Sequence, residues 1–286
     1  LHTMPDFVVG DWLLLDNNKN FIRLLDRKSC FSRKAAGSKV KKQLISANVD
    51  TAFIVCSMNE DFNLNRIERF LSLVNDSGSE AVVVLSKSDQ SDAPETLVNQ
   101  VQALDALLIV EAINCLDANS VIKLNPWIKE GNTIAVIGSS GVGKSTLVNT
   151  LQGGSVQNTG NIRENDSKGR HTTTTRSLIT LCSGGLILDT PGMREIQLAE
   201  CKDGIAATFS DIESFARNCR YYNCQHQSEP GCAVRKAIEV GALEQRRFDN
   251  YLKITRDKAI KPDSRYDRRA NNKAKDKRHQ RTHHEN

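Results

Sequence analysis

The chain has 286 residues, of which 39% are hydrophobic and 26% are charged, and its formal net charge is +5. This length favours two or three domains, and the apolar content is enough for a substantial core. No run approaches the roughly 18 apolar residues of a membrane span, and no charged and then apolar leader is present. The composition therefore predicts no membrane association and a cytoplasmic location with reduced thiols.

Two short strands joined by a turn are predicted near the N-terminus, over 7–15 and 20–25. Basic pairs follow at 27–28 and 33–34, with Phe31 between them. This pattern is typical either of a face that binds nucleic acid or of a solvated charged surface.

A sequence suited to reading a guanine base follows the predicted buried strand 80–85. Ser86, Lys87, Ser88 and Asp89 spell S-K-S-D. The Lys87 stem can lie along a purine ring, while the Asp89 carboxylate accepts hydrogen bonds from guanine N1–H and the 2-amino group. Adenine lacks this pair of donors, so the motif favours guanine.

Two further features concern the same loop. Ser86 stands where Asn or Thr is usual, so the hydrogen bond that braces the loop must come from a shorter hydroxyl. A second predicted strand, 105–111, ends at Ala112, whose backbone N–H is placed to meet guanine O6.

The strongest motif is a phosphate-binding loop between a predicted strand, 133–137, and a predicted helix, 146–151. It fits G-x-x-x-x-G-K-[ST] at every position. The loop consists of Gly138, Ser139, Ser140, Gly141, Val142, Gly143, Lys144, Ser145 and Thr146. In such loops backbone N–H groups and the helix N-terminus bind phosphate oxygens, so we expect Lys144 at the β- and γ-phosphates and the Ser145 hydroxyl on magnesium.

The apolar run 186–188 leads into D-x-x-G, from Asp189 to Gly192. D-x-x-G alone is commonly a turn, but its position after a phosphate loop favours a role at the nucleotide. Asp189 would then hold magnesium through water, and the Gly192 N–H would sense the γ-phosphate. Met193 stands where a water-orienting Gln is common, and a thioether cannot orient water.

A predicted switch lies between these two motifs, in the polar stretch 153–168 and the threonine-rich stretch 169–176. It cannot bury enough apolar surface to be firmly ordered without ligand contacts. Thr173 or Thr174 is predicted to close on magnesium. His171 is the candidate to position the attacking water, because imidazole accepts or donates near neutral pH. The alternative is a solvated loop, with the catalytic group supplied by a partner.

The order of these signatures predicts a circularly permuted domain. The S-K-S-D loop precedes the phosphate loop, whereas an ordinary GTPase has them in the opposite order. Permutation leaves a pocket intact, because only the connections between strands change. The predicted fold class is therefore α/β, a permuted P-loop GTPase domain. An ATP-using P-loop enzyme remains an alternative, in which Asp89 would be irrelevant.

A metal site is predicted near the C-terminus. Three cysteines and one histidine follow C-x4-C-x-H-x5-C spacing: Cys219, Cys224, His226 and Cys232. Four ligands can surround a tetrahedral ion and leave no open position, which indicates structural zinc. Disulfides or coincidental thiols are the alternatives. The following stretch, 233–258, is predicted as a helix whose apolar stripe packs on this module or binds a partner.

The stretch 265–281 is basic and weakly apolar, and we expect it to be disordered when free. It can bind RNA by releasing counterions from phosphates. The alternative is that it only aids solubility.

The motifs, in the order S-K-S-D, G-S-S-G-V-G-K-S-T, G-R-H-T-T-T, D-T-P-G and C-R-Y-Y-N-C-Q-H-Q-S-E-P-G-C, resemble the ribosome small subunit-dependent GTPase A family (RsgA, also called YjeQ). The resemblance spans residue 9 to about 256. It implies a monomeric GTPase that binds GTP and GDP and assists late 30S maturation through 16S rRNA, stimulated by that subunit. It also points to His171 as the catalytic residue.

The resemblance implies an N-terminal OB-fold, a permuted GTPase domain with Mg²⁺ at the nucleotide, and a C-terminal domain with one structural Zn²⁺. The expected boundaries are 1–46 for the OB-like, RNA-binding region, 47–203 for the GTPase domain, 204–260 for the zinc-binding helical domain and 261–286 for the basic tail. The first region is too short for a complete five-stranded barrel. A nucleotide-gated rRNA-binding scaffold with little turnover is the alternative function, favoured by Met193.

Overall fold

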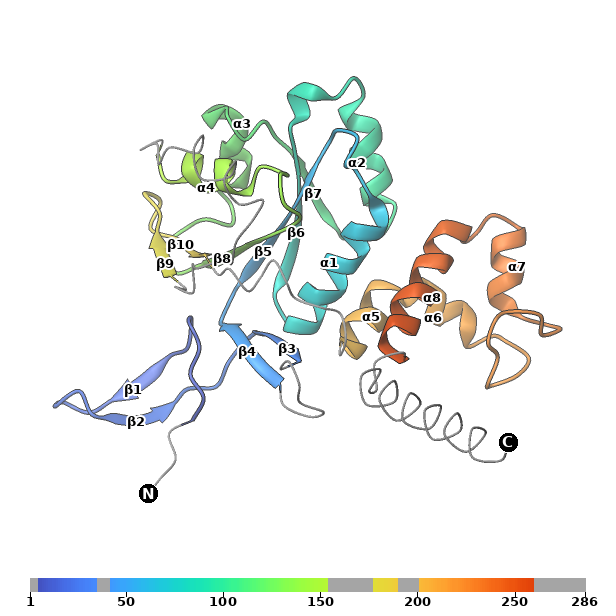
Figure 1. The fold of residues 1–286 in the computed structure, drawn as a ribbon, viewed down its shortest axis with the longest axis horizontal. Coiled ribbons are helices and arrows are strands. Elements are labelled where there is room, and N and C mark those ends of the chain that lie inside the picture. Colours follow the sequence, from blue (N-terminus) through green and yellow to red (C-terminus); the bar gives the residue numbers. More distant parts are fainter. Residues whose placement is uncertain (1–4, 35–41, 154–176, 190–200, 260–286) are drawn as a thin grey trace, which may run out of the picture.

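A six-stranded sheet with helices on both faces forms the centre of the computed structural model, which describes residues 5–34, 42–153, 177–189 and 201–259 (Figure 1). Several predicted positions lie outside the described residues: His171, Thr173, Thr174, Gly192, Met193 and the tail 261–286. For Asp189 only the backbone is described.

The sheet has the order β7-β6-β5-β8-β10-β9. Its strands are β5 (Thr51–Ser57), β6 (Glu80–Ser86), β7 (Ile109–Ala112), β8 (Thr133–Ile137), β9 (Ser177–Thr180) and β10 (Leu186–Asp189). All neighbouring pairs are parallel except β10 with β9. The chain passes from β7 at one edge back to β8 in the middle, beside β5. The strand before the phosphate loop thus follows the strand before S-K-S-D in sequence, as a permuted domain requires.

The predicted strands 80–85, 133–137 and 186–189 are confirmed, but the strand predicted over 105–111 begins only at Ile109. Asp105 starts a turn instead. Its carboxylate accepts from the Leu107 amide at 2.9 Å, and its carbonyl accepts from the Leu108 amide at 3.1 Å. Asp is favoured in such turns because its side chain bonds the backbone two residues on.

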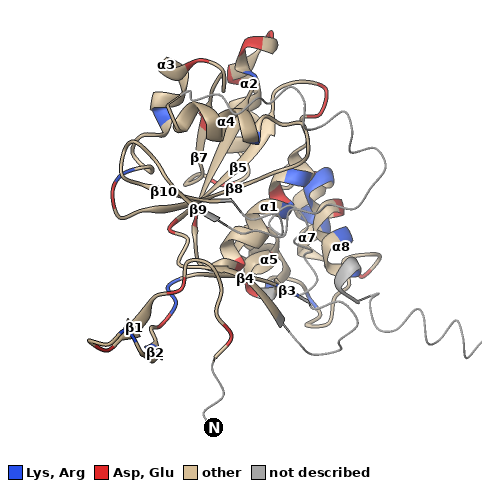
Figure 2. Cartoon of the chain, turned by 60° about the vertical axis from the view of Figure 1, so that its left-hand side comes forward, with Lys and Arg blue, Asp and Glu red and all other residues tan. Residues whose placement is uncertain are grey.

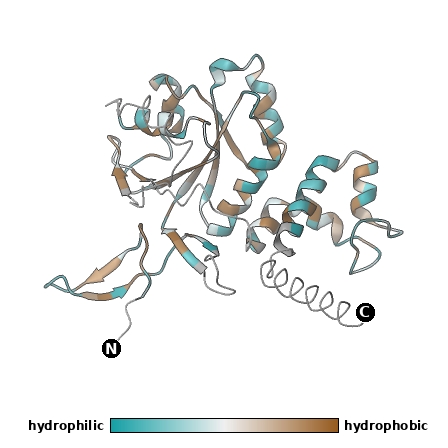
Figure 3. Cartoon of the chain, viewed as in Figure 1, coloured by the Kyte–Doolittle hydropathy of each residue, from teal (hydrophilic) through white to brown (hydrophobic). Residues whose placement is uncertain are grey.

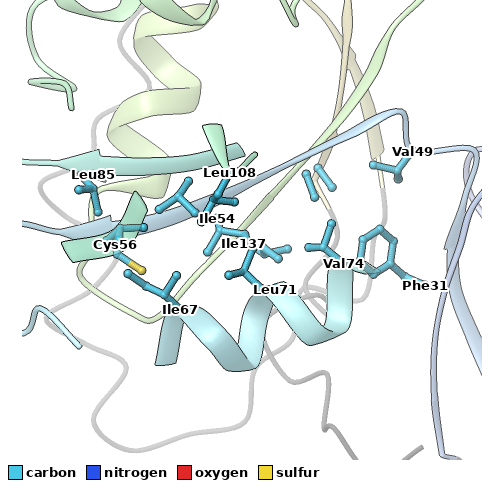
Figure 4. Packing of buried hydrophobic residues seen from close by; sticks show 14 of the residues in the cluster. Phe31, Val49, Ile54, Cys56, Ile67, Leu71, Val74, Leu85, Leu108 and Ile137 are labelled. Atoms are coloured by element: carbon cyan, nitrogen blue, oxygen red, sulfur yellow. The ribbon is translucent and has the colours of Figure 1, made fainter. Parts of the chain in front are cut away.

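Two layers of helices cover the sheet. They comprise α1 (Leu64–Ser77), α2 (Pro94–Gln102), α3 (Ala118–Val121), α4 (Lys144–Leu151) and the short η1 (Ser88–Gln90) and η2 (Ile122–Leu124). Alternation along β5 separates two cores, because successive side chains point to opposite faces. Ile54 and Cys56 pack with residues of α1 such as Ile67 (Figure 4), while Phe53 packs with Leu147 of α4 on the other face. Hydrophobic residues occur along these central strands (Figure 3).

The N-terminal part forms two small antiparallel sheets. One pairs β1 (Leu13–Leu15) with β2 (Phe21–Leu24), and the other pairs β3 (Cys30–Lys34) with β4 (Lys42–Ala47). A single parallel bridge joins Val9 to Ser46. Among the residues that the structure describes these strands do not close into a barrel, so the OB-like barrel stays a prediction.

The strand predicted over 20–25 is confirmed as β2, but the one predicted over 7–15 is reduced to β1. A turn occupies its first half. The Asp11 carboxylate accepts from the Val8 amide at 2.8 Å, and the Asp11 amide donates to the Val8 carbonyl at 3.1 Å. Gly10 has φ 94°, which extended backbone does not allow. Arg27 pairs with Asp11 at 2.7 Å and fixes this turn.

The joint between the N-terminal sheets and β5 is three residues long, and hydrogen bonds hold both of its ends. The Asn48 side chain donates to the Gly10 carbonyl at 2.8 Å and accepts from the Lys28 amide at 2.9 Å. Asp50 then bonds β8, accepting from the Thr133 amide at 2.8 Å and donating its own amide to the Thr133 carbonyl at 2.9 Å.

The C-terminal part is helical, with α5 (Lys202–Thr208), α6 (Ser210–Ala216), α7 (Ala233–Glu239) and α8 (Gln245–Ala259). The single helix predicted over 233–258 is therefore wrong, because α7 and α8 are separate. Gly241 has φ 75°, and the amides of Gly241 and Ala242 bond back to the carbonyls of Ile238 and Ala237 at 3.0 and 2.8 Å. This is the Schellman pattern that ends helices at glycine.

The C-terminal helices dock on α1 through a buried ionic cluster. Glu68 of α1 is completely buried and accepts from Arg246 at 3.1 Å and from Arg247 at 2.9 Å. Arg247 also pairs with Asp211 of α6 at 2.8 Å. Helix α5 also contacts α1, because a Cβ placed on Gly204 of α5 would lie 2.0 Å from the Ser72 carbonyl oxygen of α1.

Candidate functional site

Three strands of the central sheet end at one edge, and each carries a predicted nucleotide motif there. β6 ends at Ser86, β8 leads into Gly138, and β10 ends at Asp189. β5 separates β6 from β8, and β10 adjoins β8. In open α/β sheets ligands bind outside the carboxyl ends of the strands. The fold therefore brings residues from distant parts of the chain to one edge, as the permuted order predicts.

Glycines give the phosphate loop its shape. Gly138 has φ 145°, and a Cβ there would lie 2.3 Å from the Val55 carbonyl oxygen. Gly143, which immediately precedes α4, has φ 96°. Residues other than glycine rarely adopt such φ angles, and at Gly138 there is also no room for a side chain. The loop then turns directly into the N-terminus of α4, where backbone N–H groups and the helix dipole favour an anion.

Lys144 lies over this loop. Its side chain is buried, and its Nζ donates to the Ser139 carbonyl. The ammonium group thus stays at the mouth of the loop, where the phosphates of a nucleotide would bind. Ser145 follows it in the first turn of α4.

Ser86 connects the S-K-S-D loop to the phosphate loop. It is completely buried, and its Oγ donates to the Val142 carbonyl at 2.6 Å and to the Cys56 carbonyl at 3.3 Å. Its own carbonyl accepts from the Met58 amide at 2.9 Å. The bracing hydrogen bond predicted from a short hydroxyl is therefore present. One side chain holds the ends of β5 and β6 against the loop that follows β8.

The residues after Ser86 form a tight turn. Lys87 has φ 58°, and its carbonyl accepts from the Gln90 amide at 2.9 Å. The Ser88 amide donates to the Ile113 carbonyl at 3.2 Å, which joins the turn to the chain after β7. The turn places Asp89 in η1, at the carboxyl edge of the sheet.

The structure gives no bond from the Ala112 amide to this turn. Ile113 is the residue whose polar groups face β6, since its amide donates to Leu85 at 2.9 Å and its carbonyl accepts from Ser88. Backbone groups of a parallel strand alternate in direction, so those of Ala112 face outward. Its carbonyl accepts from Lys123 Nζ at 3.1 Å. A contact between Ala112 and guanine O6 remains a prediction.

Cys115 lies near both loops, and the sequence analysis did not indicate it. A Cβ placed on Gly143 would lie 3.7 Å from its Sγ, and its carbonyl accepts from Thr150 of α4 at 2.6 Å. Burial raises the pKa of the Cys115 thiol to about 11, and the nearby Asp89 carboxylate raises it further than Lys87 lowers it. The one indication in the sequence was that Cys115 follows shortly after the predicted strand that ends at Ala112.

The structure brings the four predicted metal ligands together. The four ligand atoms of Cys219, Cys224, His226 and Cys232 lie within 4.8 Å of one another. His226 Nδ1 is 3.6 Å from Cys219 Sγ and 3.4 Å from Cys232 Sγ, and the two sulfurs are 3.9 Å apart. Zn–S bonds of about 2.3 Å in a tetrahedron place sulfurs about 3.8 Å apart. The donor set and spacing therefore fit zinc, and all the described cysteines are free thiols.

Surrounding backbone groups support this centre. Burial raises the pKa of Cys219, but the Val234 and Ala233 amides at the start of α7 lower it below its usual value overall. The Glu229 carboxylate accepts from the Gln225 amide at 2.8 Å and the Gln227 amide at 2.9 Å, and these bonds lower its pKa to about 2. The loop between ligands is thus held by a carboxylate that stays ionised.

Comparison with known proteins gives a family match over most of the chain. Residues 24–199 match the family model described as RsgA GTPase. The Small ribosomal subunit biogenesis GTPase RsgA 2 of Vibrio parahaemolyticus is 60% identical over 259 residues, which are 91% of this chain and 72% of the relative. The Small ribosomal subunit biogenesis GTPase RsgA of Xanthomonas euvesicatoria is 48% identical over 86% of this chain and 68% of the relative.

Solved structures share the fold. The crystal structure of YloQ, described as a circularly permuted GTPase, superposes with a TM-score of 0.61 at 26% identity and covers 92% of this chain and 84% of its own. YjeQ from Thermotoga maritima has a TM-score of 0.63 at 24% identity over 90% and 86% of the two chains. The circularly permuted arrangement of the sheet is therefore shared with known proteins.

A second family model, ABC transporter, matches residues 122–279. This match contains the phosphate-binding loop, which P-loop nucleotidases have in common. It leaves out β5 and β6, and with them the S-K-S-D loop. In the described part of the chain no helix has the length and apolarity to cross a membrane.

Proposed function

The chain belongs to the RsgA GTPase family, and from this premise we propose that it cleaves the β–γ phosphoanhydride bond of GTP during late maturation of the small ribosomal subunit. The observation that carries the proposal is the 2.6 Å hydrogen bond from Ser86 to Val142. It joins the loop suited to guanine to the loop suited to phosphates, so one nucleotide can occupy both. The names of the relatives support the subunit as partner.

The nucleotide roles follow from the chemistry of each group. Lys87 and Asp89 read the purine, and the backbone from 138 to 146 holds the phosphates together with Lys144. The Ala112 amide is the proposed partner of guanine O6. GDP binds through the same contacts except those to the γ-phosphate.

Magnesium, when bound with the nucleotide, neutralises charge on the phosphates that develops during transfer. Ser145 and Asp189 are its protein partners in this proposal, joined by Thr173 or Thr174 when GTP is present. The Gly192 amide senses the γ-phosphate. His171 positions the attacking water, because Met193 cannot.

The remaining regions supply contacts to the subunit. We assign 1–46 to an OB-like RNA-binding region, 47–203 to the GTPase domain, 204–260 to the zinc-binding helical domain and 261–286 to a basic tail. 16S rRNA is the proposed partner, which places the protein in the cytoplasm, as a monomer. Zinc stabilises the fold of the third region and takes no part in hydrolysis, because its four ligands leave no open position.

The central test is the rate of GTP hydrolysis with 30S subunits, with 50S subunits and alone. We expect slow turnover alone and acceleration by 30S, of the order of the 10³-fold seen at the low end when a catalytic group is completed in trans. His171→Ala should lose the stimulated rate and keep GTP affinity. Equal rates with and without 30S would refute the proposal.

Base selection is tested separately. Asp89→Asn should move the preference from GTP to XTP, because the amide can donate where the carboxylate accepted. An ATP-using enzyme would ignore this change.

The scaffold alternative predicts that the nucleotide changes 30S affinity while single-turnover hydrolysis stays negligible even with 30S. Met193 favours it. In either case GDP and a non-hydrolysable GTP analogue must give different 30S affinities, since a ligand without differential affinity cannot shift a conformational equilibrium.

A further inference from the structure

A fully exposed aromatic ring stands between two ligands of the metal centre. Tyr222 lies in the loop from Cys219 to Cys224, and its exposed fraction is 103% of the reference value. Large aromatic side chains normally bury much of their surface, which gives a strong hydrophobic gain. A fully exposed ring on a well-held loop is accessible to a binding partner.

The loop that carries this ring is fixed on both sides. Cys219 and Cys224 are metal ligands, and the Cys224 amide donates to the Tyr221 carbonyl at 3.2 Å. The Arg220 amide donates to the Gly231 carbonyl at 3.1 Å, and its guanidinium lies 5.5 Å from the centre of the Tyr221 ring. The backbone of Tyr222 is therefore held before any partner arrives, which lowers the entropic cost of binding.

The exposed residues near the ring in sequence are polar or basic. Its exposed neighbours along the chain include Asn223 and Gln225, and exposed basic side chains flank the ligands. These basic residues are Arg217, Arg220, Arg235 and Lys236. Figure 2 shows Lys and Arg positions along the C-terminal helices. The acidic Glu229 is occupied by backbone amides of its own loop, and Glu239 lies at the far end of α7.

This combination favours one class of partner. A protein interface has a contiguous apolar core, with charged residues depleted there. Here one fully exposed ring, next to the less exposed Tyr221, lies on a loop with exposed arginines close by in sequence, which suits an unpaired base that stacks on the ring while phosphates meet the arginines. We propose that Tyr222 is a stacking platform for a single-stranded base of RNA, and that Arg220 contacts the adjoining phosphate. The proposal rests on the proposed ribosomal function and names the contact chemistry of its third region.

The first test places a fluorescent reporter at the ring. Tyr222→Trp in the full chain with zinc bound should show quenched tryptophan emission when an oligouridylate of about 12 nucleotides is added. Leu107→Trp is the matched control, because Leu107 is also highly exposed, at 90%, but lies on the GTPase domain. Its added emission should not change. Unchanged emission from position 222 under conditions where anisotropy detects bound RNA would overturn the proposal, as would an absence of RNA binding.

The second test measures affinity. Tyr222→Ala should weaken oligouridylate binding by roughly 5- to 100-fold, the range expected for one lost stack, whereas Tyr222→Phe should stay within about twofold. Zinc content and GDP affinity should match the parent chain for both variants. Equal affinity of the Ala variant and the parent chain would overturn the proposal.

The ribosome separates this proposal from the function it rests on. If 30S stimulates hydrolysis and Tyr222→Ala needs a higher 30S concentration, both stand. If 30S stimulates equally in both chains, only the stacking proposal fails. If the variant loses 30S affinity but binds oligouridylate normally, the ring contacts a ribosomal protein and the proposal is wrong. A lack of stimulation in the parent chain refutes the function instead.

Discussion

Ser86 illustrates what one small side chain does when it is completely buried between two loops. Its hydroxyl reaches across 56 positions of sequence to the Val142 carbonyl. A buried carbonyl that loses its partner costs about 1–3 kcal/mol, because water cannot replace the bond. The position therefore links folding of the domain to the shape of the nucleotide loops.

Ser86→Ala should weaken GDP binding by about tenfold and lower the free energy of unfolding by about 1–2 kcal/mol, since the hydroxyl is lost and the carbonyls of Val142 and Cys56 stay buried. Ser86→Thr keeps the hydroxyl and should retain most of the affinity. Titration with a fluorescent GDP analogue and urea unfolding measure both effects. Equal affinities for the Ala and Thr variants would show that the bond does not shape the site.

Cys115 makes stability depend on alkaline pH. Its thiol has a folded pKa of about 11 against the usual 9.0, so the folded state keeps a proton that the unfolded chain releases. The free energy of unfolding is unaffected by this difference below pH 9, where both states keep the proton, and it falls as the pH rises from 9 to 11. The slope approaches about 1.4 kcal/mol per pH unit. Cys115→Ser should show a shallower loss of unfolding free energy between pH 9 and 10.5, and parallel curves would contradict the assignment.

At this scale the sequence identified most residues of the carboxyl edge, because glycine, lysine and acid positions in the motifs have specific chemical duties. It also anticipated the role of the Ser86 hydroxyl. It missed Cys115, since a lone buried thiol has no motif and its importance comes only from contact with Gly143 and Thr150. The positions Ala112, His171 and Gly192 remain predictions.

Among the elements, α1 has the most partners. One face packs on the sheet through residues such as Ile67, and the other meets the C-terminal helices through Glu68. Its ends are set by local chemistry. The Asn63 side chain accepts from the Arg66 amide at 3.1 Å, and Gly78 ends the helix at φ 80°. Each face of this helix thus belongs to a different core.

Glu68→Gln tests the contact between those cores. Removing the Glu68 charge breaks its buried pair with Arg247, which keeps only its bonds to Asp211 and to the Thr208 carbonyl, and the expected loss of unfolding free energy is about 3–5 kcal/mol. Asp61→Asn is the matched control, because Asp61 lies in the turn just before α1 and forms an exposed pair with Arg66 of that helix at 2.6 Å. An exposed pair contributes less than about 1 kcal/mol. Urea unfolding of both variants gives the comparison, and equal losses would show that the cluster does not anchor the helices.

The long strands of the sheet were predictable because continuous apolar runs bounded by motif residues have few alternatives. The errors fell where local polar groups compete with the regular structure. Asp105 turned the start of β7, Asp11 and Gly10 shortened the first strand, and Gly241 split the last helix. In each case a local hydrogen bond or a left-handed residue decided between two conformations that the residue pattern alone allowed.

For the whole molecule, metal removal should act on one part only. Zinc binding contributes on the order of 10 kcal/mol in small metal domains, and the apolar cluster around Cys232 includes Val234 and Phe248. Chelation should therefore expose the amides of 217–241 to hydrogen exchange while GDP affinity is kept, because the nucleotide loops lie on the sheet. Restoring zinc should restore protection. Loss of GDP binding on chelation would show instead that both parts fold as a unit.

The order of the domains along the chain was predictable, but the contacts between them were predictable only in part. The sequence order of motifs required a permuted sheet, and the Cys and His spacing required a separate metal module. The docking of that module on α1 was not predictable, because Glu68 and Arg247 are 179 positions apart and charged residues are usually assigned to the surface.

The three-residue joint between β4 and β5 has a mechanical consequence. Asn48 is hydrogen-bonded to the N-terminal part through Gly10, and Asp50 is hydrogen-bonded to β8 through Thr133, so the joint is held at both ends. A partner that rotates the N-terminal sheets would therefore also rotate β5. Near the other end of the same strand the Cys56 carbonyl accepts from Ser86, so such a rotation would reach the residue that links the two nucleotide loops.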